Sequence, residues 1–215
     1  MFLARPSRID RLARLALRTV SLALALALAC RPAAPKPFNP DGLSGPQIVP
    51  PLPKPELVLT STDGRQFDLK KETEGYVTLL FFGYTNCPDV CPVHMANIAG
   101  AMKRLGPEIT NRIKVVFVTV DPARDTPEVM RTWLDHFDPS FIGLRGDSAS
   151  IASAFTQLRL GQTVHEPGAD TTSYTVGHAA IVLAFSTDNL AHVVYPFGIR
   201  QADWSKDLTL LVKRS

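Results

Sequence analysis

Residues 76–92, Tyr-Val-Thr-Leu-Leu-Phe-Phe-Gly-Tyr-Thr-Asn-Cys-Pro-Asp-Val-Cys-Pro, hold the pattern that best predicts the fold of this 215-residue chain. Their first part, 76–84, is rich in apolar and aromatic residues, as is typical of a buried strand. Apolar residues then return at helical spacing over 90–105, and Pro92 is tolerated only in the first turn of a helix. We therefore expect a buried strand that passes through a short loop into a helix, with two cysteines at the junction.

The same alternation continues outward from this unit. Residues 56–61 and 65–69 flank a Thr-Asp-Gly turn signal and predict an N-terminal β-hairpin. Strand–helix–strand order implies parallel pairing with right-handed crossovers, and a late strand pair adds antiparallel strands. The prediction is an α/β fold with a mixed central sheet flanked by helices. Its further strands are expected at 113–120, 179–185 and 192–195, and its further helices at 125–137, 147–158 and 201–213.

Residues 1–29 are typical of a secretory signal peptide. Five arginines and one acid precede an apolar run at 20–29, which ends before Cys30. The run is shorter than the roughly 18–20 residues that a membrane-spanning helix needs. An amphipathic helix is the alternative, but the Leu-Ala repeat has no polar face. We therefore expect the protein to be exported from the bacterial cytoplasm.

Cys30 follows Ala-Leu-Ala, which resembles the box before the lipid-accepting cysteine of bacterial lipoproteins. The small residue before the cysteine fits, whereas Leu28 stands where a small residue is usual. The alternative is ordinary cleavage that leaves a spare thiol, a liability in an oxidising compartment. We predict that Cys30 is lipidated and anchors the chain at the extracytoplasmic face of the cytoplasmic membrane.

The basic character of the chain belongs to the signal region. The whole chain has 23 basic and 20 acidic residues and a formal net charge of +3. Residues 1–29 hold five of the basic residues and one of the acids, so their removal leaves a net charge of −1. No run of Lys or Arg with interleaved aromatic residues remains, and no nucleic-acid partner is expected.

Residues 30–55 are expected to form a lipidated tether. Nine prolines lie within 31–55. Proline has no backbone donor and favours extended polyproline II, so we expect no strand or helix of any length here. The predicted organisation is a signal peptide at 1–29, the tether at 30–55 and one globular domain at 56–215.

Cys87 and Cys91 lie where the predicted helix begins. The free N–H groups and the macrodipole of a helix N-terminus favour thiolate, the form that attacks disulfides and binds metal ions. Side chains four residues apart on a regular helix have Cβ atoms roughly 5–6 Å apart, whereas a disulfide needs about 3.5–4.5 Å. The spacing favours a metal site, with a redox-active pair as the alternative.

Two thiolates are soft donors that suit Cu(I), with zinc as the next candidate. A structural zinc site would usually have four ligands in two close pairs, so here a third ligand must come from afar. Among the histidines, His94 is within helical reach of Cys91, and His178 directly precedes a predicted buried strand. Residue chemistry alone leaves the choice between these two open. The other histidines, expected in solvated or packing positions, are His136, His165 and His192.

Three blocks of the sequence resemble the SCO/SenC family, in the family's order. Residues 82–92 are similar to its first signature, and residues 118–127, Val-Thr-Val-Asp-Pro-Ala-Arg-Asp-Thr-Pro, to its second. Residues 174–178, Tyr-Thr-Val-Gly-His, followed by an apolar strand, resemble its third. The resemblance covers about 56–210. This chain departs from many members in having Gly177 where they carry Asp.

The resemblance implies a thioredoxin-like fold with a site for one copper ion, formed by two cysteines and a distal histidine. On this chain the ligands would be Cys87, Cys91 and His178. The implied function is an extracytoplasmic, membrane-tethered copper chaperone that helps metallate the binuclear copper centre of cytochrome c oxidase subunit II. A periplasmic copper donor is a further expected partner, and oxidation of Cys87 and Cys91 to a disulfide would abolish the site.

The alternative function is that of an enzyme, a thiol–disulfide oxidoreductase that reduces the cysteines of the same copper centre. It needs Cys87 and Cys91 but not His178. A peroxidase is a weaker third possibility, because Thr85 does not stand at the spacing before Cys87 that such enzymes use. The sequence leaves the question of an enzyme open and favours a metallochaperone.

The second block holds charged residues with simple structural explanations. Asp125 is expected to cap the following helix, and Arg124 to pair with Asp121 and hold the loop after the second central strand. In a thioredoxin-like sheet this loop would lie near the cysteines, so a role in partner docking is a hypothesis. Met95 and Met102, at helical spacing, are expected to pack in the core.

Overall fold

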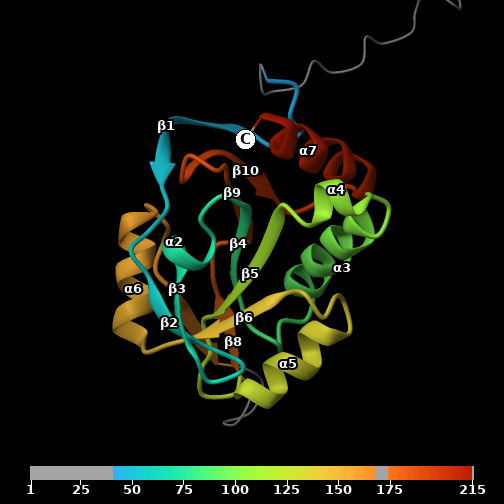
Figure 1. The fold of residues 1–215 in the computed structure, drawn as a ribbon. Coiled ribbons are helices and arrows are strands. Elements are labelled where there is room, and N and C mark those ends of the chain that lie inside the picture. The colour runs from blue at the N-terminus through green and yellow to red at the C-terminus, as the bar shows by residue number, and fades with distance from the viewer. Residues whose placement is uncertain (1–40, 168–173, 215) are drawn as a thin grey trace, which may run out of the picture. The chain divides into compact units, whose positions relative to one another are not determined.

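The computed structural model describes residues 41–167 and 174–214, which form the mixed, thioredoxin-like α/β fold that the sequence predicts (Figure 1). The predicted signal peptide and Cys30 lie outside the described residues. Within the described ranges, no helix is long and apolar enough to cross a membrane.

Eight strands form the central sheet, in the order β1-β10-β9-β4-β5-β6-β2-β3. β4 pairs in parallel with β5, and β5 with β6, as expected for strands joined by helices. The other neighbouring pairs are antiparallel, and β2 and β3 form the predicted hairpin. The bounds are β1 Gln47–Pro53, β2 Val58–Ser61, β3 Gln66–Asp68, β4 Val77–Gly83, β5 Ile113–Thr119, β6 Ile142–Arg145, β9 Ile181–Phe185 and β10 Leu190–Pro196.

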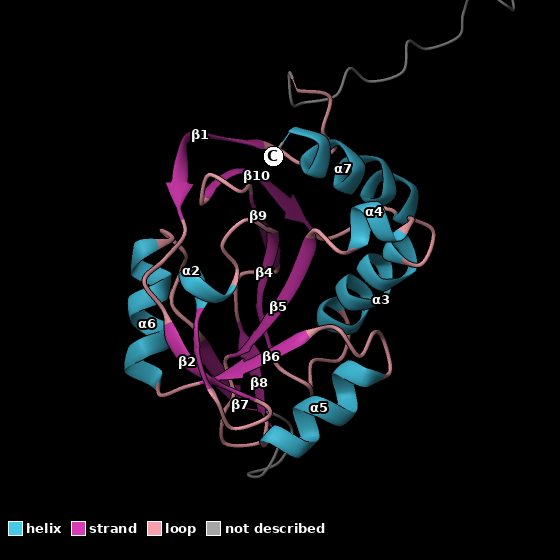
Figure 2. Cartoon of the chain, viewed as in Figure 1, coloured by secondary structure: helices cyan, strands magenta, loops and turns pink. Residues whose placement is uncertain are grey.

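Helices cover both faces of the sheet, because successive side chains of a central strand point to opposite sides. Phe81 of β4 and Phe117 of β5 lie on one side, where their rings contact α3 and α5. Phe82 points the other way, and its ring lies 4.8 Å from that of Phe155 in α6. Figure 2 shows α6 on the opposite side of the sheet from α3 and α5. The bounds are α2 Leu69–Glu72, α3 Val90–Met102, α4 Pro107–Thr110, α5 Pro127–Asp135, α6 Ser148–Gln157 and α7 Gln201–Arg214.

The proline-rich stretch differs from its prediction. Residues 47–53 form β1 at one edge of the sheet, paired with β10, so the expectation of no strand here is wrong. The pairing is interrupted between Gln47 and Leu52, where Pro50 and Pro51 lie. Proline is tolerated on an edge strand because no further strand requires its missing N–H. The folded domain therefore includes residues before position 56.

The start of α5 also differs from its prediction. Its N-cap is Thr126, whose hydroxyl accepts a hydrogen bond from the Val129 N–H at 3.3 Å. The expectation that Asp125 caps this helix is wrong, because its buried carboxylate is used by the loop that carries Cys87, as described below.

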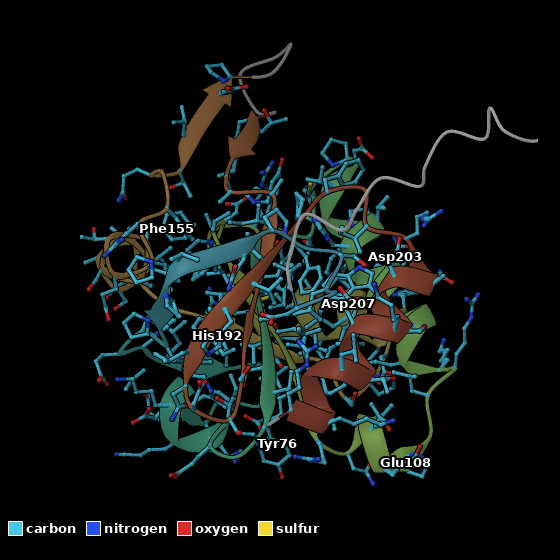
Figure 3. All side chains as sticks on the ribbon, turned by 90° about the horizontal axis from the view of Figure 1, so that it is seen from above. Tyr76, Glu108, Phe155, His192, Asp203 and Asp207 are labelled. Atoms are coloured by element: carbon cyan, nitrogen blue, oxygen red, sulfur yellow. The ribbon has the colours of Figure 1, made fainter. Side chains whose placement is uncertain are left out.

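Sequence patterns missed β6 and a separate two-stranded sheet. β7 (Val164–Pro167) pairs antiparallel with β8 (Tyr174–Gly177), and we call these two strands the hairpin arm. Among the described strands, neither β7 nor β8 pairs with the eight-stranded sheet. Figure 3 shows the arm, in orange, projecting from the body of the domain. His178 directly follows β8, in the connection that leads from the arm to β9.

Candidate metal centre

Cys87, Cys91 and His178 come together at the carboxyl end of β4. Cys91 lies in the first turn of α3, Cys87 in the loop between β4 and α3, and His178 in the connection from the hairpin arm to β9. The Sγ atoms of both cysteines and a ring nitrogen of His178 all lie within 4.8 Å of one another. Both cysteines are buried and His178 is half-buried. The fold thus gathers the three residues that the family resemblance indicated.

A glycine makes room for the buried thiol of Cys91. Gly83 is the last residue of β4, and a Cβ atom there would lie 2.9 Å from Cys91 Sγ and 2.7 Å from the Phe81 ring. Side-chain atoms do not approach so closely, so any larger residue at this position would displace the thiol. The Cys91 N–H in turn donates to Cys87 Sγ at 3.5 Å, which ties the loop cysteine to the start of α3.

The two thiols differ electrostatically. A hydrogen bond from the Cys91 side chain holds the pKa of Cys87 well below its usual range, and a hydrogen bond from the Asp89 backbone acts in the same direction. The pKa of Cys91 is raised, because its proton is held in the hydrogen bond to Cys87 and its side chain is fully buried. Cys87 is therefore the more acidic thiol of the pair, the one in which the thiolate form is favoured.

The two cysteines are free thiols in this structure. The structure therefore shows the reduced pair, and the disulfide between Cys87 and Cys91 stays a prediction. Cys87 lies before α3 and not on it, so the Cβ spacing of a regular helix does not apply to the pair and does not prevent a disulfide.

The imidazole of His178 presents its Nε2 atom to the thiols. Nε2 lies 3.4 Å from Cys91 Sγ, and Nδ1 lies 3.3 Å from the carbonyl oxygen of Ala179. A carbonyl oxygen only accepts hydrogen bonds, so this contact favours the tautomer with the proton on Nδ1 and a lone pair on Nε2. The rings of Phe81 and Tyr84 meet the imidazole edge-on, with centroids 5.8 Å away in both cases.

His94 lies outside this group. It is buried, and its Nε2 lies 3.3 Å from the carbonyl oxygen of Ala180, so it joins α3 to the connection after His178. Burial lowers the pKa of His94, which keeps the imidazole neutral. The structure thus separates the two histidines between which residue chemistry alone could not choose.

The other residues considered from the sequence lie elsewhere. Met95 and Met102 are buried in the core, as predicted. His136 is exposed at the C-cap of α5 with Nδ1 2.7 Å from the Thr132 carbonyl oxygen, and His192 pairs with Asp188. The side chain of His165, in β7, lies outside the described atoms.

Asp125 holds the loop that carries Cys87. Its buried carboxylate accepts hydrogen bonds from the Thr85 N–H at 3.1 Å, from the Thr85 hydroxyl at 2.5 Å and from the Thr119 hydroxyl at 2.5 Å. Burial raises the pKa of Asp125, and the three donors oppose this shift. Sequence reasoning missed this role because the donors lie 40 and six residues away along the chain.

The donor set fits a soft metal ion. Two sulfur atoms and one imidazole nitrogen suit Cu(I) or zinc. Cys91 Sγ and His178 Nε2 lie 3.4 Å apart, a separation that two bonds of about 2.0–2.3 Å to one ion can span. In the described part of the chain these three residues are the one group of His, Cys, Asp or Glu with such spacing. The arrangement can bind a metal ion when both thiols are reduced.

Comparisons with known proteins point to one family. The family model for SCO1/SenC matches residues 51–213. A SCO2-like protein of Rickettsia felis is 34% identical over 129 residues, which are 58% of this chain and 60% of that protein. A putative copper-binding protein of Stutzerimonas stutzeri is 34% identical over 97 residues, 45% of this chain and 47% of that one. The match thus spans about half to three fifths of the length of these relatives.

Solved structures extend the comparison to nearly whole chains. ScoI of Bradyrhizobium japonicum, solved with copper bound, is 32% identical, has a TM-score of 0.66 and is covered over 99% of its length by 74% of this chain. Apo Sco1 of Thermus thermophilus is 29% identical, has a TM-score of 0.67 and is covered over 95% of its length by 78% of this chain.

Proposed function

The chain belongs to the SCO1/SenC family, and from this premise we propose that it is an extracytoplasmic copper chaperone. It binds one copper ion through Cys87, Cys91 and His178. It helps to metallate the binuclear copper centre of cytochrome c oxidase subunit II, after loading by a periplasmic copper donor. The observation that carries the proposal is the meeting of two thiols and an imidazole lone pair within 4.8 Å.

Each residue has a distinct part in this function. The Cys87 thiolate is charged before the metal arrives, so it makes the first bond, and Cys91 must release its proton on binding. The Nε2 lone pair of His178 completes the set. Bound copper is the cargo, which the protein passes on to the copper centre of the acceptor protein.

The reduced state of the thiols controls loading. Exchange with a disulfide of a partner would oxidise Cys87 and Cys91 to a disulfide and reduce the partner's pair, which removes both thiolate ligands. The same exchange is the basis of the second candidate function, a thiol–disulfide oxidoreductase. The asymmetry of the pair favours it: the Cys87 thiolate would attack the partner disulfide, and Cys91 would then release the reduced partner.

Metal content of the reduced protein tests the chaperone. The wild type should bind about one equivalent of Cu(I). Cys87→Ser and His178→Ala each remove a ligand. They should weaken copper binding by more than the roughly 10- to 100-fold that results from loss of a residue that only orients a ligand. His192→Ala is the matched surface control. Unchanged copper affinity in Cys87→Ser would refute the site. Wild-type oxidase assembly in cells that carry His178→Ala would favour the oxidoreductase.

The membrane anchor is a separate part of the proposal. Residues 1–29 direct export, Cys30 carries the lipid, and the proline-rich segment from 30 up to β1 tethers the domain. Near its end, the Ser44 N–H donates to the buried Asp207 of α7 at 2.6 Å, which supports a firm junction with the domain. Cys30→Ala should move the protein from the membrane to the soluble fraction, and failure to do so would refute lipidation.

A further inference from the structure

We propose that Arg124, Asp121 and Tyr174 form a clamp that positions His178 for copper by fixing the hairpin arm to the end of β5. The inference rests on the proposed copper site and adds positioning residues to it. None of the three residues belongs to the metal-binding group itself.

The arm needs such a clamp because it has no backbone pairing with the central sheet. β7 and β8 pair only with each other among the described strands. β8 ends at Gly177, one residue before the histidine. The position of His178 therefore depends on the side chains that hold β8 against the body of the domain.

Arg124 makes the most extensive of these contacts. Its guanidinium carbon lies 3.6 Å from the centre of the Tyr174 ring, and Nη1 donates to the Tyr174 carbonyl oxygen at 3.1 Å. The same side chain therefore holds both the ring and the backbone at the first residue of β8. A planar guanidinium can stack and donate in this way, whereas the ammonium of lysine cannot.

Asp121 joins the other two residues of the clamp. Its carboxylate accepts hydrogen bonds from Arg124 Nε and, at 2.7 Å, from the Tyr174 hydroxyl. The residue is 1% exposed, and its own N–H donates to the Thr119 hydroxyl at 3.0 Å. The clamp is thus anchored at the carboxyl end of a central strand, where burial makes loss of a partner costly.

Further contacts carry this positioning from Tyr174 toward the histidine. The Val176 N–H donates to the hydroxyl of Tyr84 at 3.3 Å, and the Tyr84 ring meets the imidazole of His178 edge-on. On the other side of His178, His94 holds the Ala180 carbonyl. With the clamp intact, the imidazole has fixed points before and after it in the chain.

A double-mutant cycle tests the clamp in the reduced, full-length mature protein. Arg124→Gln should weaken Cu(I) binding about tenfold, as expected for a residue behind a ligand. In a His178→Ala background the same change should cost less than about twofold, because there is no longer a ligand to position. Equal losses in both backgrounds, or no loss in the wild type, would overturn the proposal.

Two further variants show whether a loss of copper affinity comes from the clamp or from general unfolding. Arg145→Gln is the matched control, because Arg145 donates to the Pro122 carbonyl of the same loop but does not touch β8. It should leave copper affinity unchanged. Tyr174→Phe removes the hydroxyl that donates to Asp121 and should weaken binding about two- to fivefold. A larger loss in Arg145→Gln than in Arg124→Gln would also contradict the clamp.

Hydrogen exchange separates this inference from the copper proposal. Without any metal, Arg124→Gln should speed exchange of the Val176 amide about tenfold and leave the Val118 amide of β5 unchanged. If the wild type binds no copper but this selective change occurs, the proposed function fails and the clamp stands. If Val176 exchange does not change, the clamp fails whatever the copper affinity.

Discussion

The two parts of the candidate centre are held in different ways. Cys87 and Cys91 lie at the junction of β4 and α3, where every residue of the strand is buried and Cys91 itself is fully buried. His178 follows an arm outside the central sheet, held by side-chain contacts. We therefore expect movement of the thiols to require disruption of the core, and movement of His178 to require only the loss of these side-chain contacts. This difference allows a ligand set that opens on the histidine side.

Asp125→Ala should have the largest effect on stability, and it should act on the loop that carries Cys87 and not on the hairpin arm. It leaves the Thr85 N–H and two hydroxyls without their acceptor, and should lower the free energy of unfolding by about 2–4 kcal/mol. Denaturant unfolding measures this change. Thr126→Ala, which removes the α5 cap, should cost about 1 kcal/mol. Equal costs for the two variants would contradict the role assigned to Asp125.

The pH dependence of alkylation should show which of the two thiols, Cys87 or Cys91, is the more acidic. The pKa of Cys87 is lowered, so its thiolate persists as the pH falls, and alkylation between pH 8 and pH 6 should slow far less than the roughly tenfold per unit of an ordinary thiol. Cys91→Ala removes the hydrogen-bond donor and should slow the reaction at pH 6 about tenfold or more.

Cys91→Ser is the matched variant, because its hydroxyl can still donate to Cys87. It should keep most of the wild-type rate at pH 6. Peptide mass spectrometry after brief alkylation identifies the modified residue, and modification of Cys91 before Cys87 would show that the assigned asymmetry is reversed.

Tyr84→Phe should loosen the arm and leave the thiols in place. The Val176 N–H loses its acceptor, which costs about 1 kcal/mol. Its amide exchange should rise about fivefold and copper affinity should fall by a similar factor, with unchanged alkylation of Cys87. Tyr76→Phe, at the opposite end of β4, is the control. Faster alkylation without faster exchange would mean that Tyr84 serves the thiol side instead.

Gly177→Asp should have the smallest effect. A Cβ atom at Gly177 would lie 3.6 Å from the Val164 carbonyl oxygen, an ordinary contact, and the position is exposed. The melting temperature should stay within about 2 °C of the wild type. Gly83→Ala, which would crowd Cys91 Sγ, is the contrasting variant on the thiol side. Comparable melting temperatures for both would remove the distinction between the two sides.

Much of the thiol side could be predicted from the sequence, because its determinants are local. The apolar run of β4, the helical spacing of α3 and Pro92 all lie within the stretch that holds both cysteines. The sequence patterns did not predict β1, β6 or the hairpin arm, and the reasons also lie in the local sequence. Proline on an edge strand, and strands of four residues, carry little periodic signal.

From sequence patterns alone one could predict the β2–β3 hairpin, the alternation of the central strands β4 and β5 with helices, and a cysteine pair at the start of a helix. Residue chemistry could not select the histidine, and only the family resemblance pointed to His178. Tertiary structure decided that choice: it places His178 Nε2 3.4 Å from Cys91 Sγ, across 87 positions of the chain, and turns His94 toward the Ala180 carbonyl. It also recruited Asp125 to the Cys87 loop. Contacts between side chains so far apart depend on the packed sheet, which no short stretch of sequence encodes.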